Sequence, residues 1–139
     1  MKSEYIDVKG YWGIAIGYDL KPLDEYRVRQ TLISIGVKSR DVEKAIDVLF
    51  GEQNSGLCVS LPELRMSLIY IGRATSEDQF WDTLAHELLD HCQYAIRMYY
   101  DVPEGTEDSA WLTGYMMRKA VQQIGEPCIN EKRQLDRLP

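Results

Sequence analysis

The segment 77–100 is the strongest candidate for a core helix, and it carries both histidines of the chain. Ser76 followed by Gln79 has the form of a capping box, which predicts that this helix begins near Glu77. Apolar residues recur along the segment at helical spacing: Phe80, Leu84, Leu88, Ala95, Ile96 and Tyr99. The rest of the chain must therefore supply elements that cover this apolar stripe.

The two histidines, His86 and His91, belong to the pattern His-Glu-Leu-Leu-Asp-His. Many zinc hydrolases carry two histidine ligands on one helix, and the Glu that follows the first histidine is the general base acting on the metal-bound water. Burying a His-Glu pair in a core helix is costly unless its charge has a partner. We therefore expect a zinc site with His86 and His91 as ligands and Glu87 as the base. The alternative is that these residues form an ordinary solvated face.

The spacing of the two histidines departs from that of the usual zinc helix. His86 and His91 are five residues apart, which separates them by about 140° around a regular α-helix, whereas four residues would separate them by only about 40°. A π-bulge at Leu88-Leu89 would absorb the extra residue and return His91 to the face of His86. In a regular helix, Asp90 would instead be the second ligand. Imidazole is the commoner zinc ligand, which favours the bulge.

The remaining pattern predicts an α+β fold with four helices and a short two- or three-stranded sheet. The expected strands are 11–18 and 65–72, the expected helices are 24–35, 39–51, 77–100 and 106–124, and 52–63 is expected to be a loop. Residues 1–125 form a single domain in this prediction, and 126–139 form a polar C-terminal tail.

Charge and composition exclude several classes of function. The formal net charge of -6, with scattered basic residues, argues against a nucleic-acid partner. No apolar run is long enough for a membrane span, and the first residues lack the apolar stretch of a secretion signal, so we expect a cytoplasmic protein without a membrane partner. Cys58, Cys92 and Cys128 show no CxxC spacing and predict reduced thiols. Cys92 is either a ligand, a reactive thiol or a packed core residue.

A catalytic zinc normally has a third protein ligand, and the natural candidate is Glu107 in the first turn of the next helix. The segment Glu107 to Gly114 reads Glu-Asp-Ser-Ala-Trp-Leu-Thr-Gly and resembles the Glu-x-x-Ala-x-x-x-Gly segment of gluzincin metallopeptidases. This resemblance implies a small zincin-like domain with zinc held by His86, His91 and Glu107 and with Glu87 as base. The one departure is the additional residue between Glu87 and His91.

A longer part of the chain resembles a group of small uncharacterised proteins from Bacteroides-type bacteria and their phages. The shared segments are Ile71-Gly72, Ala74 to Phe80, Thr83 to Glu87, Tyr99-Tyr100 and Ala110 to Tyr115. This resemblance covers about two thirds of the chain and implies a phage or mobile-element connection, but it carries no activity of its own.

The expected function is zinc-dependent peptide hydrolysis. A tight hairpin between the last two helices would put Tyr115 level with His91 and leave Glu107 at the far end. Tyr115 is then either an oxyanion donor or a tyrosine at the edge of the core. The strand 65–72 is the expected place for a peptide substrate or protein partner to add by strand pairing. The alternative function is a catalytically degenerate zincin that binds a protein partner.

Overall fold

The computed structural model describes residues 1–127. The strands are β1 (Lys2–Val8), β2 (Trp12–Tyr18), β3 (Gly56–Leu61) and β4 (Met66–Ile71). The helices are α1 (Glu25–Ser34), α2 (Ser39–Gly51), α3 (Glu77–Ala85), the π-helix η3 (His86–Cys92), α4 (Gln93–Tyr100) and α5 (Glu107–Ile124), with short 3-10 turns η1 (Pro22–Asp24) and η2 (Pro62–Leu64). Because α3, η3 and α4 follow one another without a break, residues 1–127 contain four helical rods, and the predicted α+β class is confirmed.

The strands form one mixed sheet in the order β1-β2-β4-β3. β1 pairs with β2 and β3 pairs with β4 in antiparallel fashion, whereas β2 and β4 are parallel. Strand β4 therefore lies inside the sheet with both edges paired. The prediction that a peptide could pair with the strand 65–72 is wrong for this reason, and among the described residues β3 and β1 are the edges.

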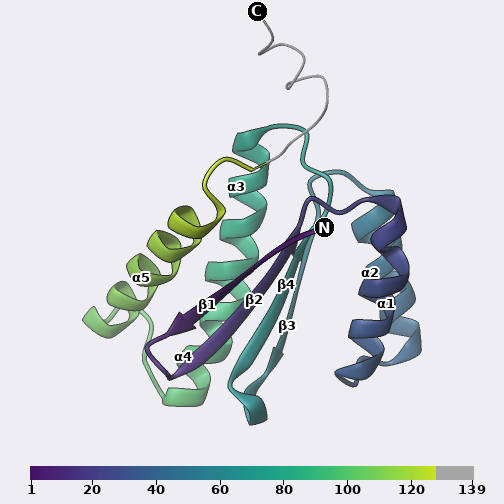
Figure 1. Cartoon of the computed structure of the whole chain (residues 1–139). Coiled ribbons are helices and arrows are strands. Elements are labelled where there is room, and N and C mark those ends of the chain that lie inside the picture. The colour runs from purple at the N-terminus through teal and green to yellow at the C-terminus, as the bar shows by residue number, and fades with distance from the viewer. Residues whose placement is uncertain (128–139) are drawn as a thin grey trace, which may run out of the picture.

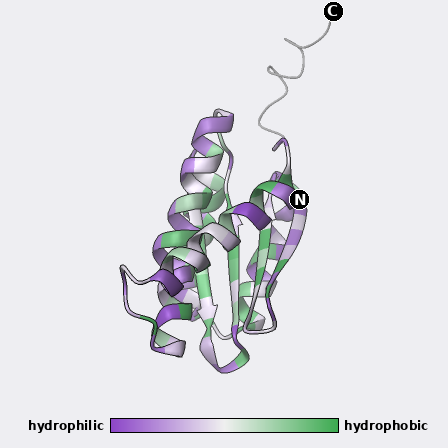
Figure 2. Ribbon diagram, turned by 90° about the vertical axis from the view of Figure 1, so that its left-hand side faces the viewer, coloured by the Kyte–Doolittle hydropathy of each residue, from purple (hydrophilic) through white to green (hydrophobic). Residues whose placement is uncertain are grey.

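Helices cover both faces of the sheet (Figure 1). The rod α3–η3–α4 and helix α5 cover one face, and their apolar side chains join Ile6, Ile14 and Ile69 in the larger core cluster. Helices α1 and α2 cover the other face with a smaller cluster around Leu32, Leu49 and Tyr70. Hydrophobic residues concentrate on the strands between these layers (Figure 2). The rod that carries the histidines is thus held by the main core.

Two glycines of β2 let aromatic rings lie flat against the sheet. A side chain at Gly13 would collide with the ring of Tyr5, and a side chain at Gly17 would lie 2.7 Å from the ring of Tyr70. The alternation of bulky and small residues in this strand therefore has the expected result, with one filled face and one face that other side chains approach closely.

In the part of the chain that the structure describes, the sheet has four strands rather than the expected two or three. The expected loop 52–63 was wrong for Gly56–Leu61, because the turn formers end at Ser55 and this segment pairs with β4. Strand β1 was also missed, since only Ile6 and Val8 of its side chains are buried. Both strands lie at edges, where weak apolar alternation is enough for pairing.

The expected tail 126–139 lies, from residue 128 onward, outside the described residues, and so does Cys128. Within the described residues, no helix combines the length and the apolar character needed to cross a membrane.

Candidate metal centre

The backbone around the two histidines is a π-helix, as the five-residue spacing predicts. The π segment spans His86 to Cys92, and at its end the Gln93 N–H donates to the carbonyl of Leu88, five residues earlier. Ser76 caps the start of the rod by accepting the Gln79 N–H at 3.1 Å, so the preceding turns are fixed in register. The predicted π-bulge is therefore confirmed, and it turns His91 back to the side of His86.

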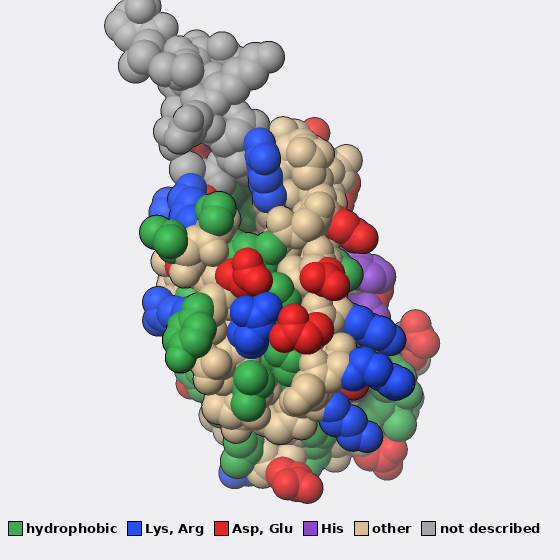
Figure 3. Space-filling model, turned by 90° about the vertical axis from the view of Figure 1, so that its right-hand side faces the viewer, with side chains coloured by type: hydrophobic (Ala, Val, Ile, Leu, Met, Phe, Trp, Pro, Cys, Tyr) green, Lys and Arg blue, Asp and Glu red, His purple; other side chains and the backbone are tan. Residues whose placement is uncertain are grey.

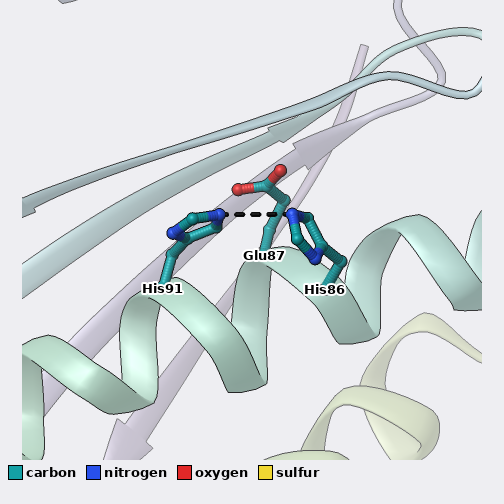
Figure 4. A group of neighbouring side chains, drawn as sticks. All are labelled: His86, Glu87 and His91. Carbon is teal, nitrogen blue, oxygen red and sulfur yellow. Dashed lines mark hydrogen bonds between the residues drawn. The ribbon is translucent and has the colours of Figure 1, made fainter.

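The two imidazole rings meet at the nitrogen atoms that a metal would use. The Nε2 atoms of His86 and His91 lie 3.2 Å apart, with the rings nearly perpendicular at 89° (Figure 4). Two nitrogens at tetrahedral positions around zinc, each about 2.05 Å from the ion, would be about 3.3 Å apart. Without metal, one ring donates its N–H to the other, and a metal ion would take the place of that proton. The pair has the separation that a tetrahedral ion requires.

Glu87 supplies a carboxylate to the same point. One carboxylate oxygen of Glu87 and one ring nitrogen of each histidine all lie within 4.8 Å of one another, and the three side chains converge from one side of the rod. Glu87 is 6% exposed. Burial raises the pKa of this carboxyl, while the nearby His91 and His86 act in the opposite direction. The group is a carboxylate with restricted access to water beside two exposed imidazoles.

Asp90 lies on the other side of the His86 ring. Its carboxylate is 2.9 Å from Nδ1 of His86, whereas Nε2 of that ring faces His91. A carboxylate on one ring nitrogen fixes the tautomer and leaves the second nitrogen unprotonated for a metal. This geometry favours Asp90 as the residue that orients His86 over its alternative role as a ligand.

The structure does not bring Glu107 or Tyr115 to this point. Glu107 is exposed in the first turn of α5 and is not part of the group formed by His86, Glu87 and His91. The Tyr115 hydroxyl donates to the carbonyl of Asp7 in β1 at 2.9 Å. Helix α5 thus directs Tyr115 to β1, the sheet edge opposite β3. The arrangement corresponds to a tyrosine at the edge of the core.

Gly56, which sequence analysis missed, brings β3 against the candidate centre. A Cβ atom at Gly56 would lie 2.8 Å from Cγ of Glu87 and 3.0 Å from Cγ2 of Thr83. Thr83 in turn donates to the carbonyl of Asn54, just before the strand. Only a glycine lets the strand approach Glu87 this closely. A glycine that opens a short apolar run was the available signal.

Cys92, which directly follows His91, belongs to the core. Its side chain is fully buried and packs in the main cluster, with Cys58 of β3 partly buried beside that cluster. A hydrogen bond with Cys58 raises the pKa of the Cys92 thiol, and burial raises it further. Both thiols are free. Of the three roles considered for Cys92, the structure favours the packed core residue.

Comparison of the chain with protein-family models, with curated proteins and with solved structures gave no match.

Proposed function

We propose that this protein is a small zinc-dependent hydrolase that cleaves peptide bonds, with His86 and His91 as zinc ligands and Glu87 as general base. The observation that carries the proposal is the π turn that brings the two Nε2 atoms to 3.2 Å beside a buried carboxylate. π turns are uncommon and occur often at functional sites.

Each residue of the group has a separate task in this proposal. The two imidazoles bind the ion through Nε2, and Asp90 holds His86 in the required tautomer. Zinc, when bound, lowers the pKa of water and polarises a carbonyl. Glu87 accepts the proton of the attacking water and delivers it to the leaving amine. Burial of Glu87 supports this task, because it makes the carboxylate a better proton acceptor than an exposed one.

The peptide class of the substrate is supported by the free edge of β3. Strand β3 lies beside Glu87 through Gly56 and pairs only with β4 among the described residues. An extended peptide that adds to this edge would pass the metal centre. We also infer a cytosolic location, since Cys58 and Cys92 are free thiols.

Metal analysis tests the site first. Elemental mass spectrometry on protein purified without a histidine tag should find about one zinc per chain, and His91→Ala should lose it. Zinc retained in His91→Ala would point to another ligand pair. Glu87→Gln should keep zinc but lose metal-dependent cleavage of a peptide library, because only the base is removed. Unchanged cleavage in that variant would exclude Glu87 as the base.

The second candidate function is a catalytically degenerate zincin that binds a protein partner. The favouring observation is that the described residues bring two histidines and one carboxylate together, with Glu107 outside the group. This function predicts bound zinc without turnover on any peptide, and zinc-dependent capture of a partner that survives Glu87→Gln.

A further inference from the structure

A groove borders β3 on the side away from the metal centre. Its volume is about 260 Å³, and its apolar lining consists of Ala45, Val48 and Leu49 of α2 together with Leu57 and the backbone of Gly56. Asp41 and Lys44 supply one charge of each sign, so the groove has no preference for a charged occupant. Sites for whole small molecules usually measure about 300–1,000 Å³. This groove is of a size for a single side chain.

The pairing of β3 with β4 fixes which backbone groups face outward. The Gly72 N–H donates to the carbonyl of Ser55, and the register continues with Leu57 opposite Tyr70. Hydrogen-bonded pairs alternate along an antiparallel ladder, so Leu57 bonds to β4 while Gly56 and Cys58 direct their N–H and C=O groups outward. Those outward groups are the ones to which another extended chain can bond.

The pleat of β3 then separates the two sides of an added peptide. The missing side chain of Gly56 points to Glu87, whereas the side chain of Leu57 lines the groove on the α2 side. Residues opposite each other in a ladder direct their side chains to the same face. A peptide residue opposite Gly56 therefore faces the metal centre, and its neighbour opposite Leu57 faces the groove. The histidines, purple in Figure 3, lie at the margin of the face that α1 and α2 present.

We propose that the groove between α2 and β3 binds an apolar side chain of an extended peptide, at the residue next to the one that faces the metal centre. This inference rests on the proposed peptide substrate and adds a specificity determinant to it. Gly56 belongs both to the groove lining and to the contact with Glu87, so the two sites are continuous along the strand. An apolar side chain fits because the groove would remove it from water without leaving a charge unpaired.

Peptide binding to zinc-loaded Glu87→Gln protein tests the inference apart from catalysis. For each position of a fluorescently labelled peptide, one version carries Leu and a second version carries Asp. The affinity of the protein for each version is measured by fluorescence anisotropy. At one position Leu should bind about tenfold or more tighter than Asp, since burial of a Leu side chain is worth at least that factor. The Leu preference should disappear in a second protein that also carries Ala45→Phe, because the ring fills the groove.

Asp47→Phe is the matched control, since it adds the same ring to an exposed position of the same helix and should keep the preference. Val48→Thr adds a hydroxyl at similar volume and should weaken the preference without the risk of overfilling. Absence of peptide binding, equal binding of Leu and Asp peptides at every position, or a preference that survives Ala45→Phe would overturn the inference. If wild-type protein cleaves no peptide but the Glu87→Gln protein still prefers the Leu peptide, only the proposed hydrolysis is refuted.

Discussion

The rod α3–η3–α4 and helix α5 pack on the same face of the sheet, and in the described residues the rod carries the group of side chains that could hold a metal ion. In the rod, His86, Glu87 and His91 converge on one another. In α5, the polar groups bond to neighbouring elements, as Tyr115 does to the carbonyl of Asp7. Candidate chemistry belongs to the helix with the irregular backbone, and the regular helix acts as scaffold.

The spacing of buried residues gives the π turn of the rod a second role besides aligning the histidines. Its buried positions recur every fourth residue: Phe80, Leu84, Leu88, Cys92 and Ile96. In a regular α-helix each such step drifts by about 40°, so the stripe would rotate by about 160° from end to end. One extra residue in a π turn removes about 100° of that drift. The turn that aligns the histidines also keeps both ends of the rod on the core.

The largest expected effect comes from changing the length of the π segment. An alanine inserted after Leu88 should rotate everything beyond it by about 100°, abolish zinc binding and destabilise the fold by more than about 3 kcal/mol, because Ile96 leaves the core. Deletion of Leu89 should retain zinc, since the histidines then stand four apart on a regular helix. Zinc content and thermal unfolding are measured for both variants. Zinc retained after the insertion would contradict the conclusion that the π turn aligns the two histidines.

Asp90→Asn tests the tautomer of His86. We expect zinc affinity to fall about 10- to 100-fold, because the amide no longer holds Nδ1 protonated with a full negative charge. Competition with a chromogenic chelator measures the affinity. Asp82→Asn is the control, because it makes the same change at an exposed position about one turn before the site, and it should leave the zinc affinity unchanged. An equal zinc affinity of wild type and Asp90→Asn would show that Asp90 does not orient His86 for metal binding.

Gln93→Met tests the bond between the two helices. The Gln93 carboxamide is buried and donates to the carbonyl of Ser109 at 3.1 Å and to Oγ1 of Thr113 at 2.7 Å. Methionine keeps the shape and removes both donors, so we expect a loss of about 1–3 kcal/mol in the free energy of unfolding. Denaturant titration measures it. A stability equal to wild type would mean that the contact does not hold α5 against the rod.

The sequence predicted the rod and its π turn because several local signals agreed there. The capping residue Ser76, the apolar stripe and the histidine spacing all describe one helix, and each acts within a few residues. Strand β3 and the contact of Gly56 with Glu87 were missed because they depend on pairing with a strand that follows in the chain. The hairpin geometry had already left Glu107 away from His91, but the contact of Tyr115 with β1 was missed, since it joins residues far apart in the chain.

Tyr115→Phe separates a scaffold role from an oxyanion donor. Loss of the hydroxyl should cost about 1 kcal/mol of stability, because one hydrogen bond to the carbonyl of Asp7 disappears. The rate of peptide cleavage should stay at the wild-type value. A fall of about 100-fold or more in that rate would instead assign the hydroxyl to the reaction, as the loss of an oxyanion donor does.

Glu107→Gln should have the smallest effect on zinc binding. It tests directly whether α5 contributes a ligand to the centre that the rod forms. Glu107 is exposed at the start of α5 and directly follows the capping residue Thr106, which accepts the Ser109 N–H at 3.2 Å. That cap fixes the first turn of α5, and Glu107 lies outside the group of ligand atoms that His86, Glu87 and His91 form. We expect zinc content and affinity equal to wild type, measured as for Asp90→Asn. A clear loss of zinc would show that the start of α5 moves to the centre when the metal binds, and the rod would then not hold the ion alone.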